Sequence, residues 1–83
     1  MVCYTTYILF SISKNKYYVG HTNNISRRLA EHNSGQNKST KLGSLWELVY
    51  FKEFDSKSEA YRLEMKIKSR GISRFLNDTE KSG

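Results

Sequence analysis

The chain has 83 residues, which suffices for one small domain and leaves no room for a separate substrate or regulatory domain. Fourteen Lys and Arg against eight Asp and Glu give a net charge of +6, which favours a polyanionic partner such as nucleic acid. A single cysteine excludes an intrachain disulfide framework and a thiolate-only zinc site, and no apolar run approaches the roughly 20 residues that span a bilayer. We expect a soluble protein of the cytoplasm, without a signal peptide.

The first half of the sequence predicts a β-hairpin followed by a helix. Residues 4–12 (YTTYILFSI) are rich in β-branched and aromatic residues, and residues 17–19 (YYV) predict a second strand after a short polar turn. The short connection favours antiparallel pairing, and Gly20 is expected to end the second strand. The capping residues TNN at 22–24 then precede a helical pattern that the NSG of residues 33–35 stops.

The second half predicts a strand and a longer helix. A polar, basic loop is expected over residues 36–44. Residues 46–54 (WELVYFKEF) carry apolar side chains on both faces, which predicts a central or well-covered strand. The SKSE of residues 56–59 is typical of a capping box, and the helix that it opens is expected to end near Arg70, before the stop at Gly71.

The predicted order is therefore β-β-α-β-α with at most a short C-terminal helix. This order indicates the α+β class, with a small three-stranded antiparallel sheet flanked by helices. We expect one domain over residues 1–83, with a folded core over about residues 3–76 and a frayed tail over residues 77–83.

Five side chains suited to chemistry on an anion are expected to converge in this arrangement. Two tyrosines come from the hairpin, an arginine and a histidine lie four residues apart on the first helix, and a glutamate lies beside the apolar stripe of the second. Each has a structural interpretation as well, as a core aromatic, a solvated charge, a helix-dipole partner, or an (i, i+4) partner of Lys68. The five candidates are Tyr7, Tyr18, Arg28, His32 and Glu64.

The spacing of these residues carries a resemblance. TTY at 5–7 and YVG at 18–20, with the arginine ten residues after Tyr18, the histidine four further on and the glutamate in the second helix, resemble the GIY-YIG nucleases. The likeness is to the small, single-domain, URI-like bacterial members and covers Tyr4 to about Arg70. The first motif lacks its glycine and isoleucine, and Asn77 is the only candidate for an asparagine that larger members carry after the glutamate helix.

The resemblance implies a metal-dependent endonuclease that hydrolyses DNA phosphodiester bonds, with a structural rather than a sequence preference. It implies that Tyr7 or Tyr18 acts as the general base or positions the attacking water, with His32 in support. It also implies that Arg28 neutralises charge on the phosphorane, and that Glu64 ligates one divalent ion, Mg or Mn. Because free tyrosine has a pKa near 10, we expect the nearby metal and cations to lower that pKa.

DNA is expected to contact the basic surface through its phosphates, without base reading. We expect no membrane partner and no small-molecule cofactor, and the biological pathway stays open. The main alternative is a catalytically weak or inactive nucleic-acid-binding module with the same fold, and a weaker one is a protein-interaction domain whose tyrosines only fill the core. The predicted phosphate contacts are Arg27, Lys38, Lys41, Lys66 and Lys68.

Overall fold

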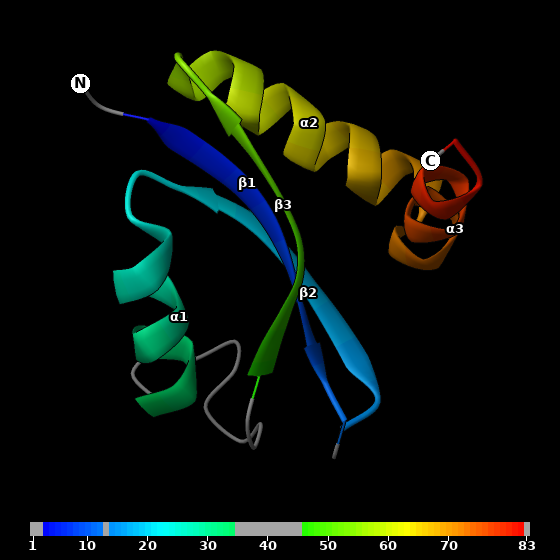
Figure 1. The fold of residues 1–83 in the computed structure, drawn as a ribbon, viewed down its shortest axis with the longest axis horizontal. Helices are drawn as coiled ribbons and strands as arrows, with labels where there is room; N and C mark the ends of the chain where they lie inside the picture. Colours follow the sequence, from blue (N-terminus) through cyan, green and yellow to red (C-terminus); the bar gives the residue numbers. More distant parts are fainter. Residues whose placement is uncertain (1–2, 13, 35–45, 83) are drawn as a thin grey trace.

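Three strands and three helices follow one another in a computed structural model, which describes residues 3–12, 14–34 and 46–82 (Figure 1). The predicted α+β class and three-stranded antiparallel sheet are confirmed. The elements are β1 (Tyr4–Ser11), β2 (Lys16–Thr22), α1 (Ile25–Ser34), β3 (Trp46–Phe54), α2 (Lys57–Arg70) and α3 (Ile72–Ser82).

The central strand of the sheet is β1, because the strand order is β2-β1-β3 and both pairings are antiparallel. The prediction that β3 is central or well covered is therefore wrong. Its apolar residues on both faces do not all reach a core, since Val49 is 44% and Phe51 55% exposed. In β1, by contrast, five consecutive residues are buried. The continuous apolar run of β1 was the better mark of the strand that both sheet faces cover.

The two faces of the sheet carry separate hydrophobic clusters. The first packs beneath α1 and contains Tyr7, Leu9 and Trp46, with Tyr18, Ile25, Leu29 and Leu48 against them. The second packs beneath α2 and α3 and contains Ile8, Val19 and Ile67, with Tyr50, Leu63, Ile72, Phe75 and Leu76 against them. Figure 1 shows α1 on one side of the strands and α2 with α3 on the other.

The second strand continues past the residue expected to end it. Gly20 pairs with Tyr7, His21 with Thr6, and Thr22 with Thr5 along the edge of β1. Because side chains alternate between the faces of a strand, His21 points to the α2 side of the sheet, opposite to Tyr18 and Gly20. This extension matters for the site described below.

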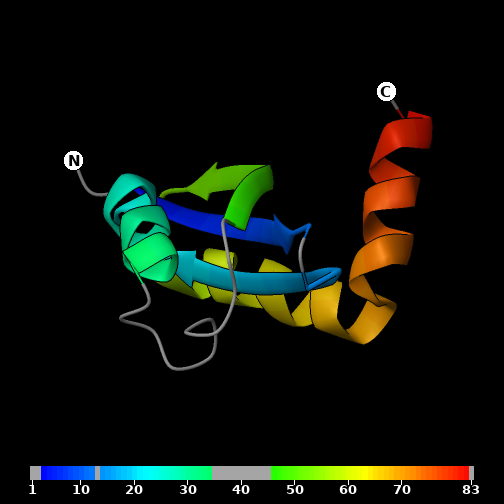
Figure 2. The same cartoon turned by 90° about the horizontal axis from the view of Figure 1, so that it is seen from below.

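The ends of the helices follow the sequence signals, except at the C-terminus. The Ser56 hydroxyl accepts a hydrogen bond from the Glu59 amide at 3.3 Å, and Gly71 ends α2 with φ +97°. The residues predicted as a frayed tail from Asn77 lie in α3, which runs to Ser82 and points in a different direction from α2 (Figure 2). Packing against the second cluster and an ion pair between Arg70 and Asp78 at 2.9 Å hold α3 in place.

No helix in the part of the chain that the structure describes is both long and apolar enough to cross a membrane.

Candidate active site

A hollow of about 580 Å³ lies around the free edge of β2, where the two faces of the sheet meet. Four of the five candidate residues line it, although they come from β1, β2, α1 and α2. The fifth, His32, lies behind the hollow and is fully buried. Those four are Tyr7, Tyr18, Arg28 and Glu64, and the other lining residues are Tyr17, Val19, Gly20, His21, Lys68 and Ile72.

His32 contacts both tyrosines on the side away from the hollow. Its Nε2 atom lies 3.3 Å from the Tyr7 hydroxyl, and its ring meets the Tyr18 ring edge-on at 4.7 Å between centroids. Burial, aided by the positive charge of Arg28, lowers the pKa of His32. The ring is therefore neutral at pH 7, and its tautomer decides whether Nε2 accepts or donates the hydrogen bond to Tyr7.

Tyr7 is only 1% exposed, although it lines the hollow. Burial raises the pKa of Tyr7 to about 12, although the neighbouring Arg28 guanidinium opposes this shift. Without a metal ion, the Arg28 guanidinium alone does not bring the pKa of Tyr7 below its usual value. At neutral pH Tyr7 keeps its proton and offers a hydrogen bond.

Gly20 explains how two tyrosine rings fit beside one strand. A Cβ atom at this position would lie 2.9 Å from the Tyr7 hydroxyl oxygen, 3.1 Å from its Cζ and 3.3 Å from Cε1 of Tyr18. The first distance is shorter than real Cβ contacts and the second is tight, so the buried Tyr7 ring would have to shift to admit the new atom. The glycine after the Tyr18-Val19 pair thus leaves room for the Tyr7 hydroxyl.

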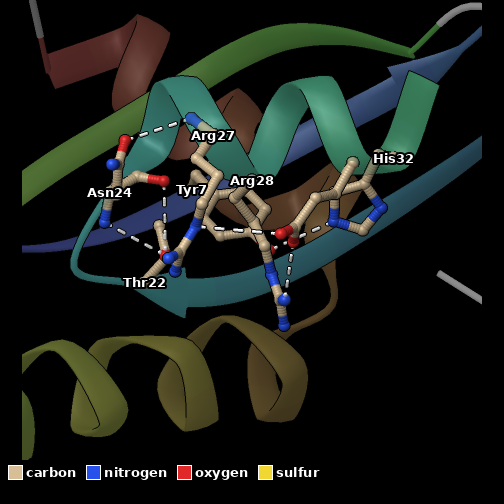
Figure 3. A network of polar contacts seen from close by, with 7 residues as sticks. Tyr7, Thr22, Asn24, Arg27, Arg28 and His32 are labelled. Carbon is tan, nitrogen blue, oxygen red and sulfur yellow. Dashed lines mark hydrogen bonds and ion pairs between the residues drawn. The ribbon is translucent and has the colours of Figure 1, made fainter. Parts of the chain in front are cut away.

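Arg28 brings a fixed positive charge to the hollow. Figure 3 shows its side chain extending from α1 past β2 toward α2, while the guanidinium of Arg27 lies apart, over Thr22. The Nη1 atom of Arg28 lies 3.2 Å from Glu31, and its buried Nε has no hydrogen-bond partner among the described residues. The Tyr7 hydroxyl raises the pKa of Arg28, so the guanidinium stays charged. An unpaired donor here is suited to an incoming anion.

Glu64 enters the hollow from the opposite face of the sheet. It is 8% exposed, and its two carboxylate oxygens lie 2.6 Å from His21 Nδ1 and 2.9 Å from Lys68 Nζ. Burial acts to raise the pKa of Glu64, but the hydrogen bonds from His21 and Lys68 outweigh it and hold the pKa below its usual value. Glu64 is therefore an ionised carboxylate at neutral pH.

Sequence reasoning missed His21, which contacts Glu64 directly. The signal was present in strand alternation, because a strand that continues past Gly20 directs the next side chain to the α2 face. That signal becomes useful only once α2 is known to cover this face. The (i, i+4) partner expected for Glu64, Lys68, is confirmed as a contact.

The residues present suit a metal held by one protein carboxylate. Nowhere in the described ranges do three His, Cys, Asp or Glu side chains gather as a metal cage would require. Magnesium, however, keeps several waters and is commonly bound through one or two carboxylates. The ionised, hollow-facing Glu64 meets that requirement, although Lys68 now contacts one of its oxygens. Its role as a ligand remains a prediction.

The predicted phosphate contacts fall in different places. Arg27 is exposed on α1, with its Nε 3.7 Å from Glu31, and Lys68 lines the hollow. Lys66 is exposed on α2 and does not line it. Lys38 and Lys41 lie outside the described residues.

Comparison with known proteins decides the family. A family model described as the GIY-YIG catalytic domain matches residues 3–75. The chain belongs to the GIY-YIG family. This GIY-YIG domain implies a nuclease-type function, and nucleases of the family generally depend on a divalent metal.

Relatives of the GIY-YIG chain carry names that say nothing of a specific activity. A UPF0213 protein of Halobacterium salinarum is 46% identical over 57 residues, which cover 68% of this chain and 74% of that protein. A UPF0213 protein of Listeria innocua is 32% identical over 78 residues, which cover 89% and 87%. The solution NMR structure of a UPF0213 protein from Bacillus halodurans has a TM-score of 0.59 at 29% identity, covering 98% of this chain and 86% of that one.

Proposed function

We propose that the protein is a divalent-metal-dependent endonuclease that hydrolyses DNA phosphodiester bonds and selects branched or nicked structures rather than sequences. The observation that carries the proposal is the hollow at the edge of β2, where two tyrosines, a charged arginine and an ionised glutamate from four elements face one space. A phosphodiester placed there meets a cation for its nonbridging oxygens and hydroxyls for the attacking water. We propose that it acts in the cytoplasm.

Arg28 would neutralise the negative charge that develops on the phosphate. Its guanidinium lines the hollow and can donate hydrogen bonds to phosphate oxygens. Tyr7, which keeps its proton, donates to the water or to a phosphate oxygen. Tyr18 is the better candidate for the base, because it is more exposed to the hollow than Tyr7. His32 fixes both rings.

The carboxylate of Glu64 would hold the divalent ion, Mg or Mn. When bound, such an ion supplies a Lewis acid that stabilises the leaving oxygen and lowers the pKa of bound water. The hydrogen bond from His21 orients the carboxylate for this task. Around the hollow, Arg27, Lys66 and Lys68 are proposed to contact DNA phosphates, as are Lys38 and Lys41.

A second candidate function is a nucleic-acid-binding module without turnover. The observation that favours it is the resting state of Glu64, since both of its oxygens already have protein partners. The raised pKa of Tyr7 points the same way. Salt-dependent DNA binding without cleavage in any divalent metal selects this alternative.

Incubation with branched, nicked, duplex and single-stranded DNA tests the main proposal. We expect cleavage in Mg²⁺ or Mn²⁺, fastest on branched or nicked DNA, and complete loss of cleavage after chelation with EDTA, restored by adding metal back. Cleavage that persists in EDTA contradicts metal dependence, and failure to cut any of the four substrates contradicts nuclease activity.

Gly20→Ala is expected to lower kcat/KM for DNA by about ten- to a hundredfold, because the added Cβ displaces the Tyr7 hydroxyl. The variant is also expected to lose about 1–3 kcal/mol of unfolding free energy through overpacking. Cleavage rates and thermal melts of the purified variant measure the two effects.

Gly71→Ala is the matched control. Its φ of +97° strains any side chain, which costs about 1–3 kcal/mol, but no atom lies within 4 Å of the new Cβ. Activity per folded molecule should therefore match the wild type. Equal loss of activity in both variants would show that Gly20 acts through stability alone.

A further inference from the structure

A second hollow, of about 310 Å³, adjoins the candidate active site at the end of β2. It lies between the start of α1 and the start of α2. His21 and Arg28 line both hollows, so the second is a continuation of the first and not a separate feature. The residues that line only the second hollow are Tyr4, Thr22, Asn23, Arg27 and Lys57.

The second hollow is strongly basic. Arg27, Arg28 and Lys57 line it, and no carboxylate does so among the residues that the structure describes. Glu31 contacts both arginines, at 3.7 and 3.2 Å, and therefore offsets one of their charges. Lys57 has no ion pair within the described ranges, so two positive charges remain uncompensated.

The two adjacent arginines diverge, which extends the positive charge along the edge of β2. The Arg28 side chain reaches toward α2, whereas the Arg27 guanidinium lies apart from it (Figure 3), and Arg27 lines the second hollow together with Thr22. A side chain that is 60% exposed, as that of Arg27 is, can reach a phosphate without desolvating a buried group.

We propose that the second hollow binds the phosphate next to the one cleaved on the same nucleic-acid strand, held by Arg27 and Lys57. The inference rests on the proposed function and deepens it. A strand with its reacting phosphate beside Arg28 and Glu64 continues past His21 into a pocket whose free charges match one phosphodiester. Tyr4, which is half-buried there, offers a ring for the attached sugar or base. Occupancy of both hollows sets the direction in which the strand crosses the site.

Single-phosphate neutralisation tests this proposal in the whole protein. Binding is measured in EDTA, so that no cleavage occurs, with short DNAs that each carry one uncharged methylphosphonate at successive positions around the cleaved bond. We expect one position next to the scissile phosphate at which neutralisation weakens wild-type binding. In Lys57→Ala the same neutralisation should weaken binding less than in the wild type, because only Arg27 then contacts that phosphate, and the slope of log affinity against log salt should fall by about 0.7–0.9.

Lys14→Ala is the matched control, because it removes the same charge at the opposite end of β2, in the turn before Lys16. It should keep the wild-type sensitivity to the methylphosphonate. Arg27→Gln provides a second variant and should behave like Lys57→Ala. If the wild type binds and cleaves DNA but Lys57→Ala responds as Lys14→Ala does, the second hollow is not a phosphate site. If the wild type shows neither binding nor cleavage, the proposed function itself fails.

Discussion

Glu64→Gln is expected to reduce metal-dependent DNA cleavage by at least about a hundredfold, the size of effect seen when one charge-stabilising group is removed from an active site. The amide keeps the shape of the carboxylate but not its charge, so it is a poor ligand for Mg²⁺ or Mn²⁺. Cleavage rates across a metal titration, with direct Mn²⁺ binding by electron paramagnetic resonance, measure the loss. The pKa of Glu64 is held low in the folded protein, so the variant should also be less stable at neutral pH.

Lys68→Ala distinguishes the contribution of the Glu64 carboxylate to metal binding from that of its ion-pair partner. This variant removes the ammonium group that lies 2.9 Å from Glu64 but leaves the carboxylate in place. Mn²⁺ affinity should stay the same or rise, because the lysine no longer competes for that oxygen. A loss of Mn²⁺ binding equal to that of Glu64→Gln would contradict the assignment of Glu64 as the ligand.

Arg28→Ala is expected to lose cleavage by about a thousandfold with only a modest loss of DNA affinity. The guanidinium is charged and lines the hollow, so it can interact with charge that develops in the transition state, although its Nη1 also contacts Glu31. Single-turnover rates at saturating protein separate the chemical step from binding. Arg28→Lys keeps the charge without the bidentate geometry and should recover only part of the rate.

Arg27→Ala removes the neighbouring arginine and serves as the comparison. Arg27 lines the second hollow but not the first, so its loss should weaken binding and spare the single-turnover rate at saturation. Equal losses of the chemical rate in the two alanine variants would contradict a specific role for Arg28.

Local signals in the sequence were sufficient for most of the fold. The capping box at Ser56 and the stop at Gly71 depend only on neighbouring residues, and both helix ends lie where they were predicted. The position of β3 in the sheet depends instead on which strands pair with each other. Apolar residues on both faces of a strand do not reveal that pairing. The length of α3 likewise depends on packing of Phe75 and Leu76 against the sheet, and on the pairing of Asp78 with Arg70.

The part of the candidate site that the spaced motif residues form could be predicted from the sequence. The spacing of Tyr7, Tyr18 and Arg28 in the sequence predicted that they converge, and all three line one hollow with Glu64. The contact of His21 with Glu64 was not predictable, because it requires both an extended β2 and the packing of α2 on that face. The pKa of Tyr7 was not predictable either, since it depends on how deeply the whole domain buries one ring.

The position of the site at the edge of β2 also makes it sensitive to partial unfolding. Tyr7 and Tyr18 belong to the cluster under α1, whereas Glu64 lies on the helix that covers the other cluster. Detachment of α2 with α3 would carry the carboxylate away while the tyrosines stayed in place. Such local openings cost less free energy than global unfolding. On the proposed function, a partly open chain would keep its basic surface but lose cleavage, because Glu64 and the two tyrosines face one hollow only when both halves of the domain are closed.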